Sequence, residues 1–276
     1  MRLLHRGQAR HSCSHVGHYS FEAFHFSVFL LAMHVAGLIL ARGGSKGIRL
    51  KNLALLKGTP LLLWSLKTMS RCRGFSSIWV SSNHDDILEL AHQNGAQIHR
   101  RSAESSSDGA SSLDAINEFL DSHSEVDVVA LIQCTSPFVR VAHLNEALAK
   151  MTSGCYDSVF SVTRSHSLRW MQLEPNKADV GTEEIRAVNF DPHCRPKRQD
   201  WNGDLVENGA FYMSSVQLLR RGLIQGGKIS FVEMSAAHSI DIDTAYDLWL
   251  AGQQASYFGF EPDGDSGDVD HLQRHY

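Results

Sequence analysis

The fold is decided by residues 38–52, which read LILARGGSKGIRLKN. The first three belong to a continuous apolar run, Val35–Leu40, and a run without polar alternation predicts a strand buried on both faces of a sheet. Three glycines follow within seven residues of that strand, and they allow the backbone to approach a ligand and point N–H groups at it. The stretch therefore predicts a buried strand followed by a loop that binds phosphate.

Cationic side chains are interleaved with these glycines. Arg42, Lys46 and Lys51 place three positive charges within ten residues, enough for a triphosphate carrying about four negative charges. The spacing matches neither the P-loop, which needs G-x-x-x-x-G-K-[ST], nor the dinucleotide loop, which needs G-x-G-x-x-G at the start of a helix. Taken alone, the loop could also be a tight turn with solvated cations. Its position after a buried strand favours phosphate binding.

Short apolar runs alternate with helical patterns through the rest of the chain. This alternation predicts an α/β fold of three layers, Rossmann-like, in which a mostly parallel sheet is covered by helices. The expected strands are Val35–Leu40, Ser77–Ser81, Gln97–Arg100, Val126–Gln133, Ser158–Thr163 and Gly209–Ser214, and the expected helices are Leu61–Met69, Asp85–Asn94, Ser111–Leu120, a helix containing Leu144 and Met151, and Ala245–Gln254.

The ends and one internal stretch fall outside this pattern. Residues 1–33 have no clear period and are expected to form a leader outside a domain of residues 34–260. Glu174–Glu207 is polar and unpatterned, and a loop of that length usually forms a functional flap or an excursion to a partner subunit. We assign this role to residues 164–207. Residues 261–276 are rich in Asp and Gly and are expected to be disordered.

Composition excludes several classes of protein. A net charge of −4 argues against a dedicated nucleic-acid binder, which needs a concentrated basic face. The five cysteines form no C-x-x-C pair, which suits a reducing compartment and supplies neither a disulfide framework nor a zinc site. The apolar run Ser27–Ala41 is short for a membrane span and contains His34. Its alternative interpretation, a secretion signal, would bring cleavage into the glycine-rich loop, so we expect a soluble protein without a membrane segment.

The loop resembles the nucleotide-binding signature of CMP-sialic acid synthetases, the N-acylneuraminate cytidylyltransferases, and is similar to that of relatives that activate other acidic sugars. The resemblance extends over residues 35–260, because GTPLLLWSL, SIWVSSNHDDI, SSLDAINEFL, LIQCTSPF, RPKRQDW, ENGAFYM and SIDIDTAYDL recur in family order. It implies transfer of a cytidylyl group from CTP to a sialic acid, a nonulosonic acid such as N-acetylneuraminate or its deaminated form. It also implies Mg²⁺ as cofactor and a homodimer or dimer of dimers. The phosphatase-like domain of animal members is expected to be absent.

The resemblance also implies roles for individual residues. Those for the nucleotide are Arg42, Gly43, Gly44, Ser45, Lys46 and Lys51 around the phosphates, with Asn52 and Ser82 near the ribose and cytosine. Those for the sugar are Gln133 between nucleotide and sugar, Arg169 and Arg198 at its carboxylate, Gln199 beside them, and Phe211 and Tyr212 around its acyl group. Among these, Arg42, Lys46, Gln133 and Arg198 are the expected catalytic residues. The family usually has proline at the position of Arg49. The arginine is expected to make the turn less rigid than proline would.

Two aspartates alternate with isoleucines in Ile240-Asp241-Ile242-Asp243. An alternation of period two directs both carboxylates to one side and the isoleucines to the other. Paired carboxylates suit Mg²⁺ that is also bound to substrate phosphates. Alternatively, Asp243 or Thr244 caps the following helix. The general base stays open between a water on the magnesium ion and the Asp241 carboxylate.

Three further alternatives remain at the level of sequence. The basic cluster Arg195–Arg198 also fits a nuclear-localisation signal, so the nucleus and the cytoplasm are both open. Gln133 could be a buried amide satisfied by the turn that follows it. Arg49, and Asn83 and His84 where relatives usually carry an aspartate, also fit a non-catalytic nucleotide-sugar-binding paralogue. A Rossmann dehydrogenase is disfavoured because the chain lacks its glycine spacing.

Overall fold

A computed structural model describes residues 33–173 and 184–262. Apart from Met33, the predicted leader lies outside the described residues, as do residues 174–183 of the predicted flap and most of the predicted tail. None of the helices within the described ranges combines the length and the apolar character needed to cross a membrane.

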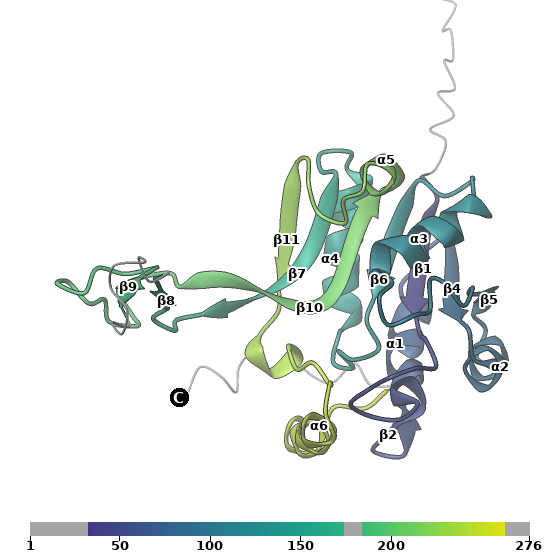
Figure 1. The fold of residues 1–276 in the computed structure, drawn as a ribbon, viewed down its shortest axis with the longest axis horizontal. Coiled ribbons are helices and arrows are strands. Elements are labelled where there is room, and N and C mark those ends of the chain that lie inside the picture. Colours follow the sequence, from purple (N-terminus) through teal and green to yellow (C-terminus); the bar gives the residue numbers. More distant parts are fainter. Residues whose placement is uncertain (1–32, 174–183, 263–276) are drawn as a thin grey trace, which may run out of the picture. The chain divides into compact units, whose positions relative to one another are not determined.

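Among the described residues, seven strands form one sheet in the order β11-β7-β10-β6-β1-β4-β5 (Figure 1). All neighbouring strands are parallel except β10, which is antiparallel to both β6 and β7. This confirms the predicted mostly parallel sheet. The strands are β1 (Val35–Leu40), β4 (Ser77–Ser82), β5 (Gln97–Arg100), β6 (Val128–Ile132), β7 (Ser158–Ser165), β10 (Asp204–Ser215) and β11 (Ile229–Glu233).

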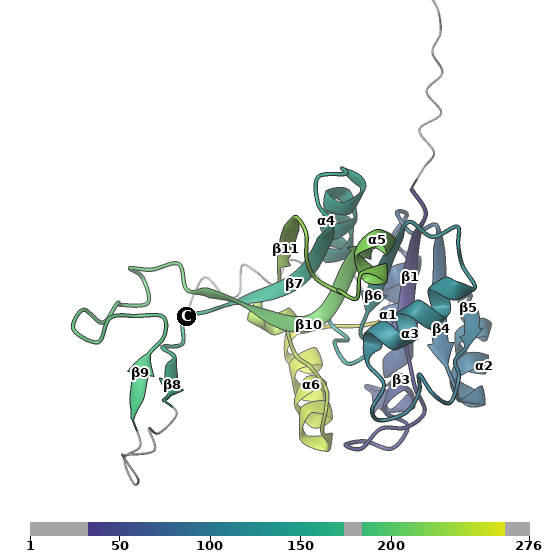
Figure 2. The same ribbon diagram turned by 45° about the horizontal axis from the view of Figure 1, so that its top comes forward.

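Helices cover both faces of this sheet, which gives the three predicted layers. Leu62 of α1 (Leu61–Ser70), Ile87 of α2 (Asp85–Gln93) and Leu144 of α4 (Val141–Thr152) pack on one face. Phe119 of α3 (Ser112–Asp121) and Leu219 of α5 (Val216–Arg220) pack on the other. In Figures 1 and 2, α3 accordingly lies in front of β1 and β6, and α1 lies behind them.

Helix α6 (Ala245–Phe258) joins a separate apolar cluster at one end of the sheet. Its Ala251 and Ala255 pack with Trp64 of α1 and with Phe138, which follows β6. The helix is capped by Thr244, whose hydroxyl accepts the N–H of Asp247 while the Asp247 carboxylate accepts the N–H of Thr244. Thr244 therefore fills the capping role that the sequence left open, and Asp243 is not used for it.

Strands β7 and β10 extend beyond the sheet as a two-stranded ribbon, with β8 (Trp170–Gln172) and β9 (Ile185–Ala187) at its far end (Figures 1 and 2). Strand β10 begins five residues before the predicted Gly209–Ser214, because its first residues pair only with β7. That half is exposed on both faces and so lacks an apolar period. The short elements are η1 (Lys51–Leu53), β2 (Leu55–Leu56), β3 (Thr59–Pro60) and η2 (Ala236–His238).

Candidate active site

The candidate site lies at the ends of two adjacent parallel strands. The chain passes from β1 to β4 and β5 on one side and then returns to β6 on the other side of β1. Loops that leave such neighbouring strands in opposite directions open a crevice at the carboxyl ends of the strands, where α/β proteins bind ligands. A pocket of about 160 Å³ occupies this position, lined by Leu40, Arg42, Gly44, Ser45, Lys51, Asn52, Gln133, Cys134 and Thr135.

A second pocket, of about 220 Å³, adjoins the first. It shares Leu40, Arg42 and Gln133 with the first pocket and continues toward the loop between β5 and α3. Arg101, Asp108, Ala110 and Ser112 complete its lining. The two pockets therefore form one continuous crevice around Leu40, Arg42 and Gln133.

The glycine-rich loop is held from the side of β4. The N–H of Gly43 donates to Asn83 Oδ1 at 2.9 Å, and a Cβ at Gly43 would lie 2.9 Å from the His84 ring. On the other side, Asn52 is buried and its Nδ2 donates to the carbonyl of Arg42 at 3.1 Å. Asn52 lines the pocket, but its amide nitrogen supports the loop backbone. Asn52, Asn83 and His84 thus hold the backbone of the loop, and none of them pairs with a cationic side chain of the loop.

The far end of the loop rests on the segment that carries the two aspartates. A Cβ built on Gly47 would lie 2.1 Å from the backbone carbonyl oxygen of Asp243, so no side chain fits there without a shift. Lys51 Nζ pairs with Asp243 Oδ1 at 2.9 Å, and the Lys51 side chain is only 16% exposed. Two contacts therefore join the predicted phosphate loop to the predicted metal ligands.

The segment Ile240–Asp243 is not a strand, but its side chains alternate as predicted. Ile242 is fully buried, whereas Asp241 and Asp243 reach solvent. The N–H of Ile242 donates to the carbonyl of Thr135 at 2.9 Å, which anchors the segment beside the turn after β6. Asp241 and Asp243 therefore lie next to the strand-end pocket that Thr135 and Lys51 line.

Electrostatics distinguishes Asp241 from ordinary surface carboxylates. Partial burial raises its pKa even though its side chain keeps some contact with water, and the nearby Asp243 raises it further. A hydrogen bond with Thr135 and the Lys51 charge act in the opposite direction. Two neighbouring carboxylates beside a strand-end pocket have the chemistry to share a hard cation. Among the described residues, no group of three or more His, Cys, Asp or Glu residues is arranged to hold a metal ion.

The structure brings some, but not all, of the other predicted site residues to this pocket. Gln133 follows β6 and lines both pockets. Ser82 is fully buried, and its hydroxyl accepts the N–H of His84, so it supports the turn instead of lining the pocket. Phe211 is also fully buried in the main core, because successive residues of a strand face opposite sides. Tyr212 is partly exposed on the other side of the strand, but it lines neither strand-end pocket.

Tyr212 lies close to acidic groups. Its hydroxyl donates to Glu207 Oε2 at 3.2 Å. Burial raises the pKa of Tyr212 to about 12, with further contributions from Glu207 and Asp241. The phenol is therefore neutral at physiological pH and acts as a hydrogen-bond donor to Glu207 of the same strand.

The two predicted sugar-binding arginines lie on the ribbon, away from the pocket of their own chain. Arg169 pairs with Asp204 at 2.9 Å, and its backbone N–H donates to Asn189 Oδ1. Arg198 and Gln199 lie in an exposed turn before β10. None of these residues lines either strand-end pocket.

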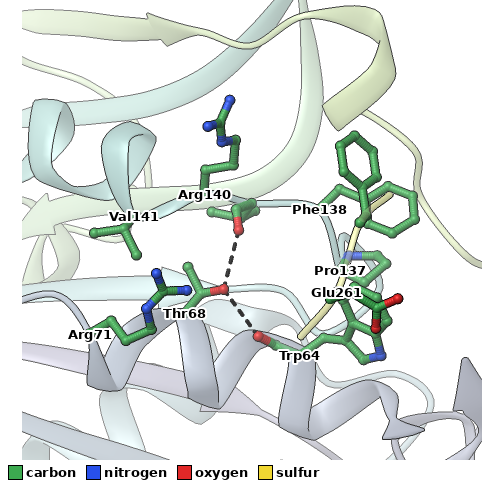
Figure 3. A pocket seen from close by; sticks show the side chains of 10 residues that line it. Trp64, Thr68, Arg71, Pro137, Phe138, Arg140, Val141 and Glu261 are labelled. Carbon is green, nitrogen blue, oxygen red and sulfur yellow. Dashed lines mark hydrogen bonds between the residues drawn. The ribbon is translucent and has the colours of Figure 1, made fainter. Parts of the chain in front are cut away.

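A further pocket lies on the opposite side of α1 and contains none of the predicted site residues (Figure 3). The hydroxyl of Thr68 donates to the carbonyls of Trp64 and Val139, at 3.1 and 3.3 Å, which closes its floor. Arg71 and Arg140 lie at its edge. We assign it to the packing between α1 and the loop that follows β6.

Three residues of the strand-end site were missed from sequence. Arg101 is 7% exposed and lines the second pocket, and its buried Nε has no hydrogen-bond partner within residues 33–173 and 184–262. Asp108 pairs with Arg42 and Lys46, and Gly47 contacts Asp243. Arg101 and Asp108 lie in the loop after β5, whose sequence has no apolar periodicity. They reach the site because β5 pairs with β4. Gly47 stood in the quoted loop, but its neighbour is almost two hundred residues away in the chain.

Comparisons with known proteins agree with this architecture. A family model for cytidylyltransferases matches residues 36–251, and the chain therefore belongs to the cytidylyltransferase family. The chain is 47% identical over 227 residues to N-acylneuraminate cytidylyltransferase A of Danio rerio and 48% identical to N-acylneuraminate cytidylyltransferase of Oncorhynchus mykiss. Each match covers 82% of this chain but 52% and 51% of the relative, so the chain spans about half the length of these curated relatives.

Solved structures show the same fold at low sequence identity. The structure of a CMP:2-keto-3-deoxy-manno-octonic acid synthetase complexed with CTP has a TM-score of 0.60 at 16% identity, covering 81% of this chain and 99% of that one. A 4-diphosphocytidyl-2C-methyl-D-erythritol synthase from Anaerococcus prevotii has a TM-score of 0.57 at 12% identity, covering 82% and 97%.

Proposed function

We propose that the chain transfers a cytidylyl group from CTP to a sialic acid, giving CMP-sialic acid and pyrophosphate. One observation carries this proposal: two cations of the glycine-rich loop, Arg42 and Lys51, line a strand-end pocket, and Lys51 pairs with one of the two neighbouring carboxylates, Asp243. The names of the two fish relatives support sialic acid as the acceptor. We further propose that residues 34–260 act as one cytidylyltransferase domain.

Phosphate recognition is assigned to the loop. Gly44 and Ser45 line the pocket with Arg42, so backbone N–H groups and a guanidinium can act on the same anion. Lys46 is 80% exposed and can reach the outer phosphates. The adjoining pocket, with Arg101 and Ser112, is the proposed place of the base and ribose.

Magnesium is assigned to Asp241 and Asp243. The raised pKa of Asp241 supports this assignment, because a bound dication would remove the repulsion between the two carboxylates. When bound there, Mg²⁺ would offset negative charge on the phosphates of CTP. Lys51, held against Asp243, supplies a fixed positive charge at the same place.

The acidic sugar is assigned to the side of the pocket between Gln133 and Tyr212. The carboxylate of the sugar suits a bidentate pair with a guanidinium, and the ribbon carries Arg169 and Arg198. Since neither lines the pocket of its own chain, we propose that they serve the site of a partner subunit in a homodimer or dimer of dimers. Exposed apolar side chains on the ribbon, Trp170, Met171, Ile185, Leu205 and Val206, support such a contact.

The proposed chemistry is an in-line displacement. The anomeric hydroxyl of the sugar attacks the α-phosphorus of CTP and gives up its proton to a base, either the Asp241 carboxylate or a water. The bond from phosphorus to the bridging oxygen breaks, and pyrophosphate leaves. Arg42 and Lys46 offset the charge that grows on the leaving group, and Gln133 holds the sugar against the nucleotide. The chain thus contributes mainly orientation and electrostatic stabilisation.

The test measures pyrophosphate release and CTP binding on the same preparation. Purified chain with CTP, Mg²⁺ and N-acetylneuraminate should release pyrophosphate, and Lys46→Ala should lose this activity. The second candidate, a non-catalytic nucleotide-sugar-binding paralogue, is favoured by the exposed Arg49 in the loop. It predicts uptake of CTP in a calorimeter with no turnover of any acidic sugar, and absence of CTP binding would overturn both candidates.

Location is proposed from one further feature. Arg195 and Lys197 are exposed or partly exposed in the ribbon with Arg198, so the cluster is accessible to an import receptor. We propose nuclear or cytoplasmic location. A fluorescent fusion whose Arg195–Arg198 cluster is changed to alanines should leave the nucleus if the cluster is the signal.

A further inference from the structure

The loop between β5 and α3 carries a carboxylate into the phosphate site. Asp108 Oδ1 lies 3.2 Å from Arg42 Nη1, and Asp108 Oδ2 lies 3.2 Å from Lys46 Nζ. The two oxygens of one carboxylate therefore bind two of the cations assigned to the phosphates of CTP. Arg42 Nη1 also donates to the carbonyl of Ser107 at 2.9 Å, so two acceptors of the same loop converge on it.

The root of this loop is fixed by side-chain hydrogen bonds, whereas its tip is exposed and turns on backbone hydrogen bonds of its own, from the N–H of Ser107 to the carbonyl of Glu104 and from the N–H of Ala110 to the carbonyl of Ser107. At the root, Arg101 donates to the carbonyl of Ser105 and the N–H of Ser102 donates to Glu118 at 2.7 Å. At the other end, Ser111 caps α3. At the tip, Asp108 is 57% exposed and a Cβ on Gly109 would meet nothing within 4 Å. The Asp108 side chain is therefore not part of the packed core, and rotating it away breaks its two ion pairs.

We infer that Asp108 is an internal competing anion that a phosphate chain must displace from Arg42 and Lys46. The inference rests on the proposed function in one respect, that these two cations bind phosphate. Asp108 and Arg42 also line the same pocket, so the displaced carboxylate would leave at its edge. Without ligand, the ion pairs of Asp108 hold Arg42 and Lys46 in place and offset the repulsion between these two cations.

Asp108 thereby acts as a specificity-determining residue. A ligand that engages both cations gains only the difference between its own contacts and those of Asp108, so weakly charged ligands are disfavoured. A nucleoside without phosphate has no anion that competes with Asp108 for Arg42 and Lys46. Asp108 also lines the pocket proposed for the base and ribose, so the substitution that tests its charge must keep the shape of its side chain. Removing the carboxylate should therefore change the affinity for phosphate chains and leave the affinity for cytidine unchanged.

The experiment measures binding of inorganic tripolyphosphate, CTP and cytidine to the full chain by calorimetry. Asp108→Asn keeps the shape of the side chain and removes its charge. In this variant the ligand no longer has to break two exposed ion pairs, so the affinity of the variant for tripolyphosphate and CTP should exceed that of the parent chain by about three- to tenfold. The gain should be largest at about 10 mM ionic strength and nearly absent at about 1 M, because salt screens exposed charges. Affinity for cytidine should not change.

Asp121→Asn is the matched control. It removes the same charge from an exposed aspartate on α3 that pairs with Arg220 at 2.8 Å, outside both strand-end pockets. It should bind tripolyphosphate as the parent chain does. An equal gain in both variants would assign the effect to net charge and overturn the inference, as would unchanged or weaker tripolyphosphate binding by Asp108→Asn. If neither the parent chain nor Asp108→Asn binds any of the three probes, the proposed function fails with it. Binding by the parent without a gain in the variant overturns the role of Asp108 alone.

Discussion

Because Gly47 packs closely against the carbonyl of Asp243, the substitution Gly47→Ala tests whether the loop and the aspartate segment must stay in contact. In Gly47→Ala the new Cβ would lie 2.1 Å from that oxygen, whereas ordinary contact begins at 3.4 Å. Either the loop or the aspartate segment must therefore move by about 1.3 Å, since both partners are backbone. Such a displacement separates the loop cations from the two carboxylates. A misplacement of about 1 Å costs roughly 100-fold in rate, so we expect kcat/KM to fall by about that factor.

The assay is pyrophosphate release under saturating Mg²⁺, with thermal unfolding measured in parallel. Gly47 does not have a positive φ, so alanine adds no backbone strain of that kind. The expected destabilisation, about 1–3 kcal/mol from overpacking, leaves a folded protein whose activity can be measured. Gly252→Ala in α6 is the matched control, because its Cβ would meet nothing within 4 Å and its activity should not change. A folded Gly47→Ala variant with kcat/KM within threefold of the parent value would refute the proposed coupling.

Three more predictions follow from exposure and charge. Lys46→Ala should lower kcat/KM by at least about 100-fold without lowering Tm, because its side chain is 80% exposed; a parallel loss of Tm would contradict this. The folded-state pKa of Asp241 is raised above 3.8, so its ionisation destabilises the fold as the pH rises through that pKa. Asp241→Asn should therefore have a higher Tm than the parent chain at pH 7, and this difference should disappear as the pH falls toward 3.8. The pyrophosphate release of the variant should no longer respond to Mg²⁺. A lower Tm of the variant at pH 7 would argue against the predicted effect of burial. Burial raises the pKa of the Cys134 thiol to about 12, so mass spectrometry after iodoacetamide treatment at pH 8 should find Cys155 and Cys194 alkylated but not Cys134 until the chain unfolds.

The sheet could be predicted from sequence where strands are buried on both faces. Val35–Leu40 was predicted with the bounds that β1 has, and Val126–Gln133 contained β6. The early half of β10 was missed because it pairs only with β7 and is exposed on both faces, so its adjacent apolar residues Leu205 and Val206 show no alternation with polar ones. Helix α5 was missed because it has only five residues, too few to show a helical period.

The candidate site was predictable in part. The loop residues Arg42 and Lys51 lie on one pocket because they are close in sequence and follow a buried strand. Phe211 and Tyr212 could not both line a pocket, and the period of a strand already carries that information. Arg101 and Asp108 left no such signal, since the pairing of β4 with β5 and an irregular loop bring them to the pocket.

The central claim is cytidylyl transfer to a nine-carbon acidic sugar, and product identification tests it most directly. The chain is incubated with CTP, Mg²⁺ and equal amounts of N-acetylneuraminate, deaminated neuraminate and a 3-deoxy-octulosonate, and the products are identified by mass spectrometry. We expect CMP conjugates of one or both nine-carbon acids together with pyrophosphate. A product formed only from the eight-carbon acid, or CTP recovered unchanged beside all three sugars, would contradict the account.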